Sequence, residues 1–249
     1  KDLYAVDPVN EVEFFYLRPR DIATYVGSGA LDVGITGRDL LRDARMPGAR
    51  EVESLGFAGS TFRFAGRPGR FQELADLEGL RVATAYPGLV DAFLDERGIA
   101  VDIVPLDGAV ESAVQLGVAD AVADVVSTGT TLRQAGLEIF GPVLLESDAV
   151  LIAGPEEAPG TETLLRRLRG VLAARQYVLV DYDLPVALVD RAIAVAPGLE
   201  SPTISPLRDP EWVAVRVMSP RRDVNRVMDE LYAIGARAIL VTEILAARL

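Results

Sequence analysis

Residues 123–132 read ADVVSTGTTL, a run in which an acid and a pair of valines lead into five small polar residues and a leucine. One interpretation is that a buried strand ends here and the chain simply turns. The other is that the turn opens a helix whose free N–H groups, with the hydroxyls of the loop, hold a phosphate group. The density of hydroxyls at a strand-to-helix junction favours the second interpretation.

A second copy of this pattern lies earlier in the chain. Residues 32–40 read DVGITGRDL and residues 124–132 read DVVSTGTTL, so Asp, Val, Thr, Gly and Leu coincide without a gap. The repeat is either chance, because short Gly/Thr motifs are common, or the mark of two similar α/β lobes that face one cleft. In the second case each glycine lets the backbone approach a ligand closely.

The two copies differ where a ligand would touch them. The later copy has Thr130 and Thr131, neutral donors that suit an anion, and we expect that loop to bind phosphate. The earlier copy has Arg38 and Asp39, and a carboxylate there repels phosphate but accepts hydrogen bonds from a sugar or a base. We expect the earlier loop to face a nucleoside-like group, although Asp39 is equally typical of an ordinary first helical turn.

Composition excludes several classes of function. The chain of 249 residues has a net charge of −12, which argues against a broad nucleic-acid surface. It contains no cysteine and no histidine, which removes disulfides, Cys/His zinc sites and His-dependent catalytic triads. No apolar run approaches the ~20 residues of a membrane span. The absence of cysteine fits a reducing compartment, and we expect a cytoplasmic protein.

The order of predicted elements indicates α/β architecture, because strands and helices alternate through the first half of the chain. Strands are predicted over 11–19, 30–36, 79–87, 101–108, 118–128 and 148–155, and helices over 19–29, 37–44, 88–99, 109–117 and 163–176. From residue 177 the order becomes β-α-β-β-α-β, the ferredoxin-like split unit. The chain begins at Lys1 without a methionine and directly in a predicted strand, residues 1–8, so we expect the natural N-terminus, with a further strand and helix, to lie upstream.

The segment DVVSTGTTLRQAGL, residues 124–137, closely resembles the phosphoribosyl-diphosphate signature of the ATP phosphoribosyltransferase family. The similarity extends over essentially the whole chain, through residues 14–41, 83–87, 106–126, 175–183, 197–207 and 220–240. The tail resembles the long form of the family, which carries its own regulatory domain.

The resemblance implies a bilobal catalytic part like the type II periplasmic binding proteins, followed by a ferredoxin-like domain. We expect residues 1–62 with 147–176 to form lobe I, 63–146 to form lobe II, and 177–249 to form the regulatory domain. The implied reaction joins N1 of ATP to C1 of phosphoribosyl diphosphate with Mg²⁺, the first step of histidine biosynthesis. The family also implies inhibition by L-histidine and assembly of dimers into hexamers.

The resemblance also assigns residues to sites. Phosphoribosyl diphosphate is expected at Asp124, Ser127, Thr128, Gly129, Thr130 and Thr131. ATP is expected at Arg18, Asp39, Leu40, Thr84 and Tyr86, and the catalytic residues at Arg18, Glu111 and Asp124. L-histidine is expected at Asp183, Leu199, Ser201, Thr203, Met218 and Ala238. Mg²⁺ is expected mainly on the substrate diphosphates, with no protein ligand assigned.

The chain departs from the family pattern in two places. A lysine-bearing loop that follows the family's opening strand is absent, and Gly88 and Asp91 stand where an asparagine and a basic residue are expected. Plainer interpretations also stay open: Arg18 as a surface arginine, Tyr86 as a strand cap, residues 200–207 as plain loop, and Asp183 as a helix N-cap.

Three classes of function compete at this stage. Besides the transferase, the sequence allows a non-catalytic bilobal small-molecule-binding protein or a purely regulatory amino-acid-binding protein. The hydroxyl-rich loop argues against the second class, and the complete two-lobed first part argues against the third.

Overall fold

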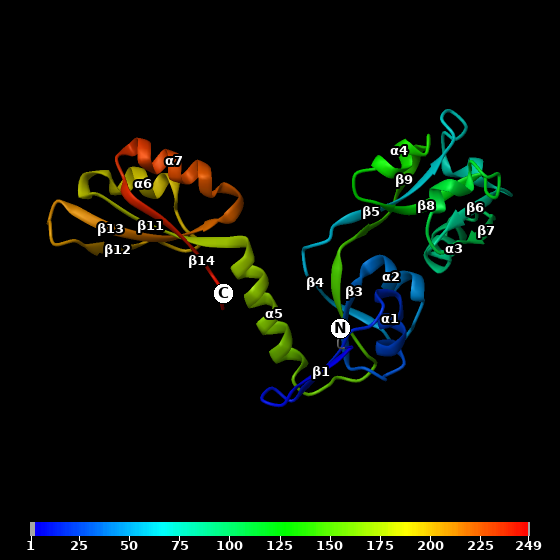
Figure 1. The fold of residues 1–249 in the computed structure, drawn as a ribbon, viewed down its shortest axis with the longest axis horizontal. Helices are drawn as coiled ribbons and strands as arrows, with labels where there is room; N and C mark the ends of the chain where they lie inside the picture. The colour runs from blue at the N-terminus through cyan, green and yellow to red at the C-terminus, as the bar shows by residue number, and fades with distance from the viewer. Residues whose placement is uncertain (1–2, 249) are drawn as a thin grey trace. The chain divides into compact units, whose positions relative to one another are not determined.

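A computed structural model describes residues 3–248 of the chain, which divides into two compact units, Lys1–Pro159 and Gly160–Leu249 (Figure 1). This division lies earlier than the expected domain boundary at 176/177. The reason is helix α5 (Thr161–Gln176), which packs on the second unit: Arg221 Nε donates to the Arg175 carbonyl at 3.2 Å, and Ala247 N to the Gly170 carbonyl at 3.1 Å. The expected split of the catalytic part into two lobes at residues 62 and 147 stays a prediction.

The first unit contains a small antiparallel sheet covered by two helices. Its strand order is β3 (Val33–Gly37), β10 (Ala149–Ala153), β4 (Arg50–Ser54). Helices α1 (Pro19–Gly27) and α2 (Arg38–Ala44) pack on it through a core that includes Val26, Leu41, Val150 and Ile152. We call this part the first lobe.

A larger mixed sheet forms the rest of the first unit, and we call it the second lobe. Its strand order is β7 (Asp102–Pro105), β6 (Arg81–Thr84), β8 (Ala121–Val126), β5 (Ser60–Gly66), β9 (Glu138–Ser147). Strands β6, β7 and β8 are parallel, and β5 is antiparallel to both its neighbours. Helices α3 (Pro87–Asp95) and α4 (Thr130–Gln134), with the 3₁₀ turns η1 (Leu74–Leu77) and η2 (Val110–Ala113), complete the lobe.

The chain passes between these two sheets twice, once from β4 to β5 and once from β9 to β10. The two crossing segments run antiparallel, since Ser60 pairs with Ser147 in one sheet and Ser54 with Val150 in the other. This confirms the expected α/β class and gives the first unit its two-lobed construction.

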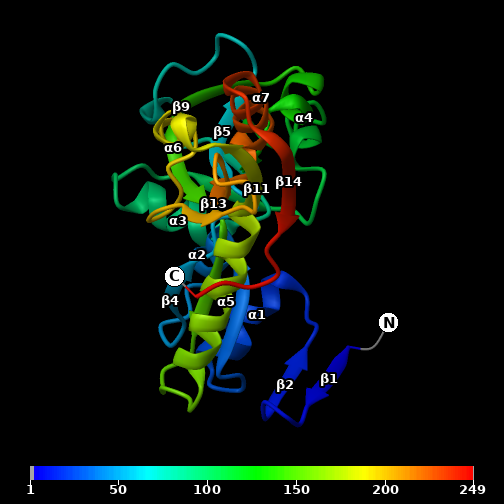
Figure 2. The same ribbon diagram turned by 90° about the vertical axis from the view of Figure 1, so that its left-hand side faces the viewer.

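An N-terminal hairpin precedes the first lobe. Strands β1 (Tyr4–Asp7) and β2 (Val12–Phe15) pair with each other in a two-stranded sheet of their own (Figure 2). The strand predicted over 11–19 is therefore shorter, because Pro19 opens α1.

The second unit has the predicted β-α-β-β-α-β order after α5. Strands β11 (Tyr177–Pro185), β12 (Thr203–Pro206), β13 (Trp212–Pro220) and β14 (Arg237–Glu243) form an antiparallel sheet in the order β12-β13-β11-β14. Helices α6 (Val189–Val195) and α7 (Val224–Ile234), preceded by the 3₁₀ turns η3 (Val186–Leu188) and η4 (Arg221–Asp223), lie on one face of this sheet (Figure 1). Alternation along β11 buries Val180 and Tyr182 against the helices, which leaves Asp181 and Asp183 on the other face.

Two sequence predictions need correction. Strands β4, β5 and β9 were not predicted, and the helix expected over 109–117 is only the short turn η2. The turn begins at Ala109, whose φ of 49° is outside the helical region, and Gly117 with φ of 70° ends the segment. Across residues 3–248, no helix combines the length and apolar content needed to cross a membrane.

Core packing in the second unit gives a stability prediction. Leu231 of α7 is fully buried, so Leu231→Ala should lower the free energy of unfolding by about 2–5 kcal/mol. Leu240 of β14 is 62% exposed, and Leu240→Ala should change the free energy of unfolding by less than about 0.5 kcal/mol. Urea unfolding monitored by the ellipticity of the protein measures both, and equal effects would contradict the described packing.

Candidate active site

The turn after β8 presents a set of hydroxyls at the start of α4. Gly129 has φ of 70° and is the N-cap residue, a conformation that glycine adopts without strain. The hydroxyls of Thr128 and Thr130 lie 3.0 Å apart, and Ser127, Thr128, Thr130 and Thr131 are exposed. The loop therefore brings together the residues expected to hold a phosphate.

Arg133 adds a positive charge to this loop. Its guanidinium donates to the Thr128 carbonyl at 3.0 Å and to Thr130 Oγ1 at 3.3 Å. Arg133 was not among the residues expected at the site, although it stands two residues after Thr131 in the same motif. These hydrogen bonds from Arg133 fix the Thr128 carbonyl and the Thr130 hydroxyl. The positive charge also makes the loop favourable for an anion.

The turn from β3 to α2 differs in both backbone and side chains, and its N-cap residue Gly37 is extended, with φ of −76°. Asp39 is only 7% exposed, and Ser147 Oγ both accepts from the Asp39 N–H at 3.1 Å and donates to Asp39 Oδ1 at 2.9 Å. A Cβ on Gly37 would lie 2.2 Å from Asp39 Oδ1, so only glycine lets the carboxylate fold back over the turn. The carboxylate is thus fixed in place by the second crossing segment.

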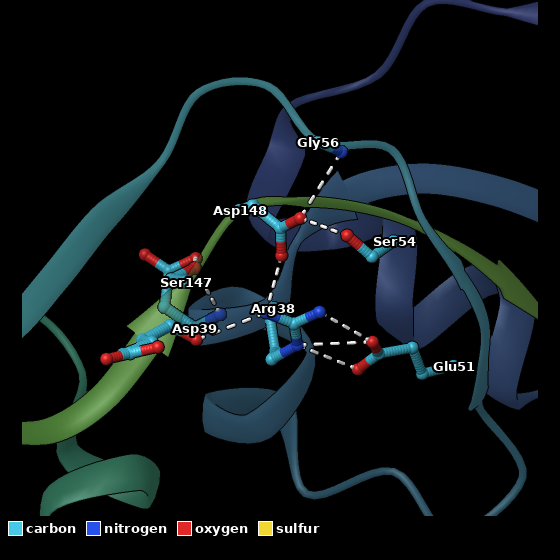
Figure 3. Close-up of polar contacts among 8 residues, drawn as sticks. Arg38, Asp39, Glu51, Ser54, Gly56, Ser147 and Asp148 are labelled. Atoms are coloured by element: carbon cyan, nitrogen blue, oxygen red, sulfur yellow. Dashed lines mark hydrogen bonds and ion pairs between the residues drawn. The ribbon is translucent and has the colours of Figure 1, made fainter. Parts of the chain in front are cut away.

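Arg38, the neighbour of Asp39, pairs with one carboxylate from strand β4 and one from the segment between β9 and β10 (Figure 3). Its guanidinium donates to both carboxylate oxygens of Glu51, at 2.7 to 3.1 Å, and pairs with Asp148. Asp148 also accepts from the Ser54 hydroxyl and from the Gly56 N–H at 3.4 Å. The start of α2 and the two connections between the lobes are therefore tied into one polar cluster.

Two hollows open beside this cluster. One, of about 460 Å³, is lined by Arg38, Gly59, Ser60, Thr61, Val126, Ser127, Glu146, Ser147 and Asp148. The other, of about 270 Å³, is lined by Gly37, Asp39, Ala58, Ser60, Val125, Ser127, Ser147, Asp148 and Ala149. Since Ser127 borders both, the start of the hydroxyl loop and the Asp39 turn share one cleft.

Three more predicted residues interact electrostatically with Asp39 or with one another. The pKa of the Asp124 carboxyl is raised, first by burial and then by the charges of Glu111 and Asp39. The pKa of the Tyr86 hydroxyl is raised by burial and by Asp39 and Asp124, while Arg20 opposes the shift. Asp39 of the first lobe and Tyr86, Glu111 and Asp124 of the second therefore act on a common region.

The three remaining residues expected at ATP differ in their burial. Thr84 is fully buried, and its Oγ1 accepts a hydrogen bond from the Tyr86 N–H at 3.0 Å. In this arrangement its side chain holds the Tyr86 backbone in position. Leu40 is half-buried on α2, and Arg18 is exposed as the N-cap residue of α1. Contact of these three with ATP stays a prediction.

The residues expected to bind L-histidine are spread over the second unit's sheet. Asp183 on β11 lies beside a bulge of β14 that contains Ala238, whose φ is 51°. Met218 pairs with Leu179, about 13 Å along β11 from Asp183 at the usual rise per residue. Thr203 lies on the edge strand β12, and Leu199 and Ser201 precede it. A shared ligand for all six stays a prediction.

Among residues 3–248, no group of three or more acidic side chains is arranged to hold a cation. The expected placement of Mg²⁺ on the substrate diphosphates stays a prediction.

The arrangement defines a two-lobed α/β protein whose cleft lies between two strand-to-helix turns, one rich in hydroxyls and one carrying a carboxylate. A family model described as "ATP phosphoribosyltransferase" matches residues 18–170, and one described as "HisG, C-terminal domain" matches residues 174–246. The chain belongs to the ATP phosphoribosyltransferase family.

Named relatives agree with this assignment. The chain is 62% identical to the ATP phosphoribosyltransferase of Arthrobacter sp. (strain FB24) and 58% identical to that of Streptomyces coelicolor, in each case over all of this chain and 89% of the relative. A solved ATP phosphoribosyl transferase (HisG:HisZ) complex from Thermotoga maritima is 25% identical, with a TM-score of 0.58 over 66% of this chain and 79% of that one.

The opposite pKa shifts of two neighbouring acids give a pH prediction. Because the pKa of Asp124 is raised by folding, its ionised form opposes folding above its ordinary pKa, and Asp124→Asn should increase the melting temperature at neutral pH. The gain should vanish as the pH falls below that ordinary value, where the carboxyl is protonated in both states.

Asp120 is the matched control, because Arg81 lowers the pKa of its carboxyl. Its contribution to stability is present above the ordinary pKa and is lost as the pH falls through the lowered value. Asp120→Asn should therefore decrease the melting temperature at neutral pH. Thermal melts between pH 3 and pH 8 measure both variants, and shifts of the same sign would contradict this account.

Proposed function

We propose that this chain transfers the phosphoribosyl group of 5-phosphoribosyl 1-diphosphate to N1 of ATP, giving phosphoribosyl-ATP and pyrophosphate. The observation that carries the proposal is that Ser127, the first residue of the hydroxyl-rich loop, and Asp39 line the same hollow. Family membership supports the reaction, and the cleft supports the assignment of one substrate to each turn.

Each turn suits the chemistry of one substrate. The 5-phosphate is proposed to bind the loop hydroxyls, the N–H groups at the start of α4 and Arg133, all of which stabilise an anion. The Asp39 carboxylate is proposed to accept hydrogen bonds from the amino group of adenine or a ribose hydroxyl. Asp124, at the end of β8, is proposed to bind the ribose hydroxyls of the phosphoribosyl donor.

The transfer needs positioning more than covalent catalysis. As the bond from C1 to the diphosphate oxygen breaks, pyrophosphate leaves with the electron pair, and the N1 lone pair of adenine forms the new bond. Positive charge develops at the ribosyl centre, and the nearby carboxylates Asp124 and Glu111 are proposed to stabilise it electrostatically. Arg18 is proposed to stabilise phosphate charge from α1, and alignment of the two substrates supplies much of the acceleration.

A divalent cation is proposed to arrive with the substrates. Diphosphate oxygens are good Mg²⁺ ligands, and residues 3–248 offer no acidic cluster that would hold the ion without them. Mg²⁺ would neutralise the departing diphosphate, while the chain's own residues orient the ribose and the adenine.

The second unit is proposed to be the regulatory part. L-histidine is proposed to bind around Asp183, whose carboxylate suits an α-amino group, with the hydroxyls of Ser201 and Thr203 available for the carboxylate. We also propose a homo-oligomeric, cytoplasmic enzyme of the dimer-to-hexamer type.

Removing one loop hydroxyl tests the phosphate assignment. Thr131→Ala should cost about 1.5–3 kcal/mol of binding free energy, because it deletes a hydrogen bond to a charged group. The dissociation constant for phosphoribosyl diphosphate should rise about 10- to 150-fold. Calorimetric titration measures the dissociation constant, with Ser28→Ala at the C-cap residue of α1 as an exposed hydroxyl control. Equal affinity in both variants would refute the assignment.

Removing the carboxylate of Asp183 tests the regulatory assignment. Asp183→Ala should abolish inhibition by L-histidine while turnover without histidine stays at the wild-type level. Initial rates with and without histidine measure this, and Asp181→Ala, on the same face of β11, is the control. Retained inhibition would place the effector elsewhere, and loss of turnover would assign Asp183 a structural role instead.

A further inference from the structure

The two lobes are joined a second time, away from the crossing segments. Asp43, near the end of α2 in the first lobe, accepts from the N–H groups of Gly88 and Leu89 at 2.9 and 3.2 Å, both at the start of α3 in the second lobe. Its other carboxylate oxygen pairs with Arg20 of α1 at 2.8 Å. We call Arg20, Asp43 and Gly88 the inter-lobe latch.

Helix α3 depends on this contact for its cap. Its N-cap residue is Tyr86, which makes no side-chain cap, so the helix itself leaves its first N–H groups without a side-chain acceptor. Gly88 and Leu89 occupy the positions that a local cap residue would normally satisfy. Asp43 provides that cap from the opposite lobe, and the carboxylate also complements the positive end of the helix dipole.

Gly88 is required for the fit. A Cβ at this position would lie 2.3 Å from the backbone oxygen of Asp43 and 3.2 Å from Arg45 Cδ. Asp91, one turn along α3, pairs with Arg45 at 2.7 Å. The two departures from the family pattern, at 88 and 91, therefore both lie where α3 contacts α2 and its C-cap residue Arg45.

Arg20 extends the latch to Tyr86. Its guanidinium donates to the Ala85 carbonyl at 2.7 Å and lies 5.2 Å from the centre of the Tyr86 ring. The Asp43 side chain is 8% exposed and Arg20 is 46% exposed, so the carboxylate and its two N–H donors form the shielded part of the contact.

We propose that Arg20 and Asp43 are positioning residues: the inter-lobe latch holds α3 against α2 and thereby fixes Tyr86 opposite Asp39 and Asp124 in the cleft. Opening the lobes would leave the Gly88 and Leu89 N–H groups without this acceptor, so the latch favours the closed cleft. This inference rests on the proposed use of the cleft by the two substrates.

A distance measurement tests the latch without turnover. The chain has no cysteine, so spin labels attach only at introduced sites; Thr24→Cys on α1 and Glu96→Cys after α3 are both exposed. Double electron–electron resonance on the labelled, ligand-free protein should give longer distances between the two lobes in Asp43→Ala than in the parent. Asp43→Asn, which keeps an acceptor for the two N–H groups but loses the charge, should fall between Asp43→Ala and the parent.

Steady-state kinetics test the positioning role in the same parent protein that carries the two labelling cysteines. Asp43→Ala and Arg20→Ala should lower kcat about 10- to 100-fold, the order expected when a reactive geometry shifts by about 1 Å. Asp43→Asn should recover part of the loss. Affinity for phosphoribosyl diphosphate alone, measured by calorimetry, should stay within about threefold of wild type, less than 1 kcal/mol, because the loop Ser127–Thr131 is unchanged.

The matched control is Asp91→Asn, which removes an inter-lobe ion pair whose side chains are 53% and 47% exposed. An exposed pair contributes little, so distances and kcat should stay at wild-type values.

Unchanged distances or unchanged kcat in Asp43→Ala overturn the proposal. Should Asp43→Ala fail to fold, Asp43→Asn and Gly88→Ala carry the same test. Absence of product with the wild-type protein would instead refute the proposed function, while the distances would still report on the latch.

Discussion

The hydrogen bond between Ser147 and Asp39 connects the parts of the first unit on which its chemistry depends. Ser147 lies where the chain passes from the large sheet back to the small one, and Asp39 begins the helix that follows β3. Because the serine hydroxyl is both donor and acceptor toward the same residue, the crossing segment and the start of α2 are fixed together. Arg38 and Asp148 strengthen this junction, and the two hollows of the cleft open directly beside it.

The cleft is bordered by two strand-to-helix turns, each with a glycine as the N-cap residue of its helix. Gly37 at the first turn is extended, with φ of −76°, whereas Gly129 at the second is left-handed, with φ of 70°. The side chains then diverge: the first turn buries a carboxylate, and the second exposes hydroxyls beside Arg133. Two turns with unlike side chains suit two substrates that differ in charge and shape.

Local pattern was sufficient for much of the fold and for the residues at both turns. Alternation and helix-start signals located α1, α2, α3 and the whole second unit, and the repeated motif predicted that Asp39 and Thr131 occupy equivalent places. Strand β4 carries charges on both faces, and β9 contains Gly141 with φ of 66° and then Pro142, so neither resembles an ordinary strand.

Ser147 and Asp43 were missed because their partners lie far away in the sequence, and no local pattern reports such contacts. Thr84 is fully buried because β6 lies between β7 and β8 in the sheet, a position that the local sequence alone does not report.

The central claim is that the two turns bring ATP and phosphoribosyl diphosphate together for reaction, rather than merely binding them. The most direct measurement incubates the protein with both substrates and Mg²⁺ and follows product by mass spectrometry together with released pyrophosphate. The account predicts phosphoribosyl-ATP and pyrophosphate in equal amounts, and neither when one substrate is left out. Binding of both substrates without formation of phosphoribosyl-ATP would contradict it.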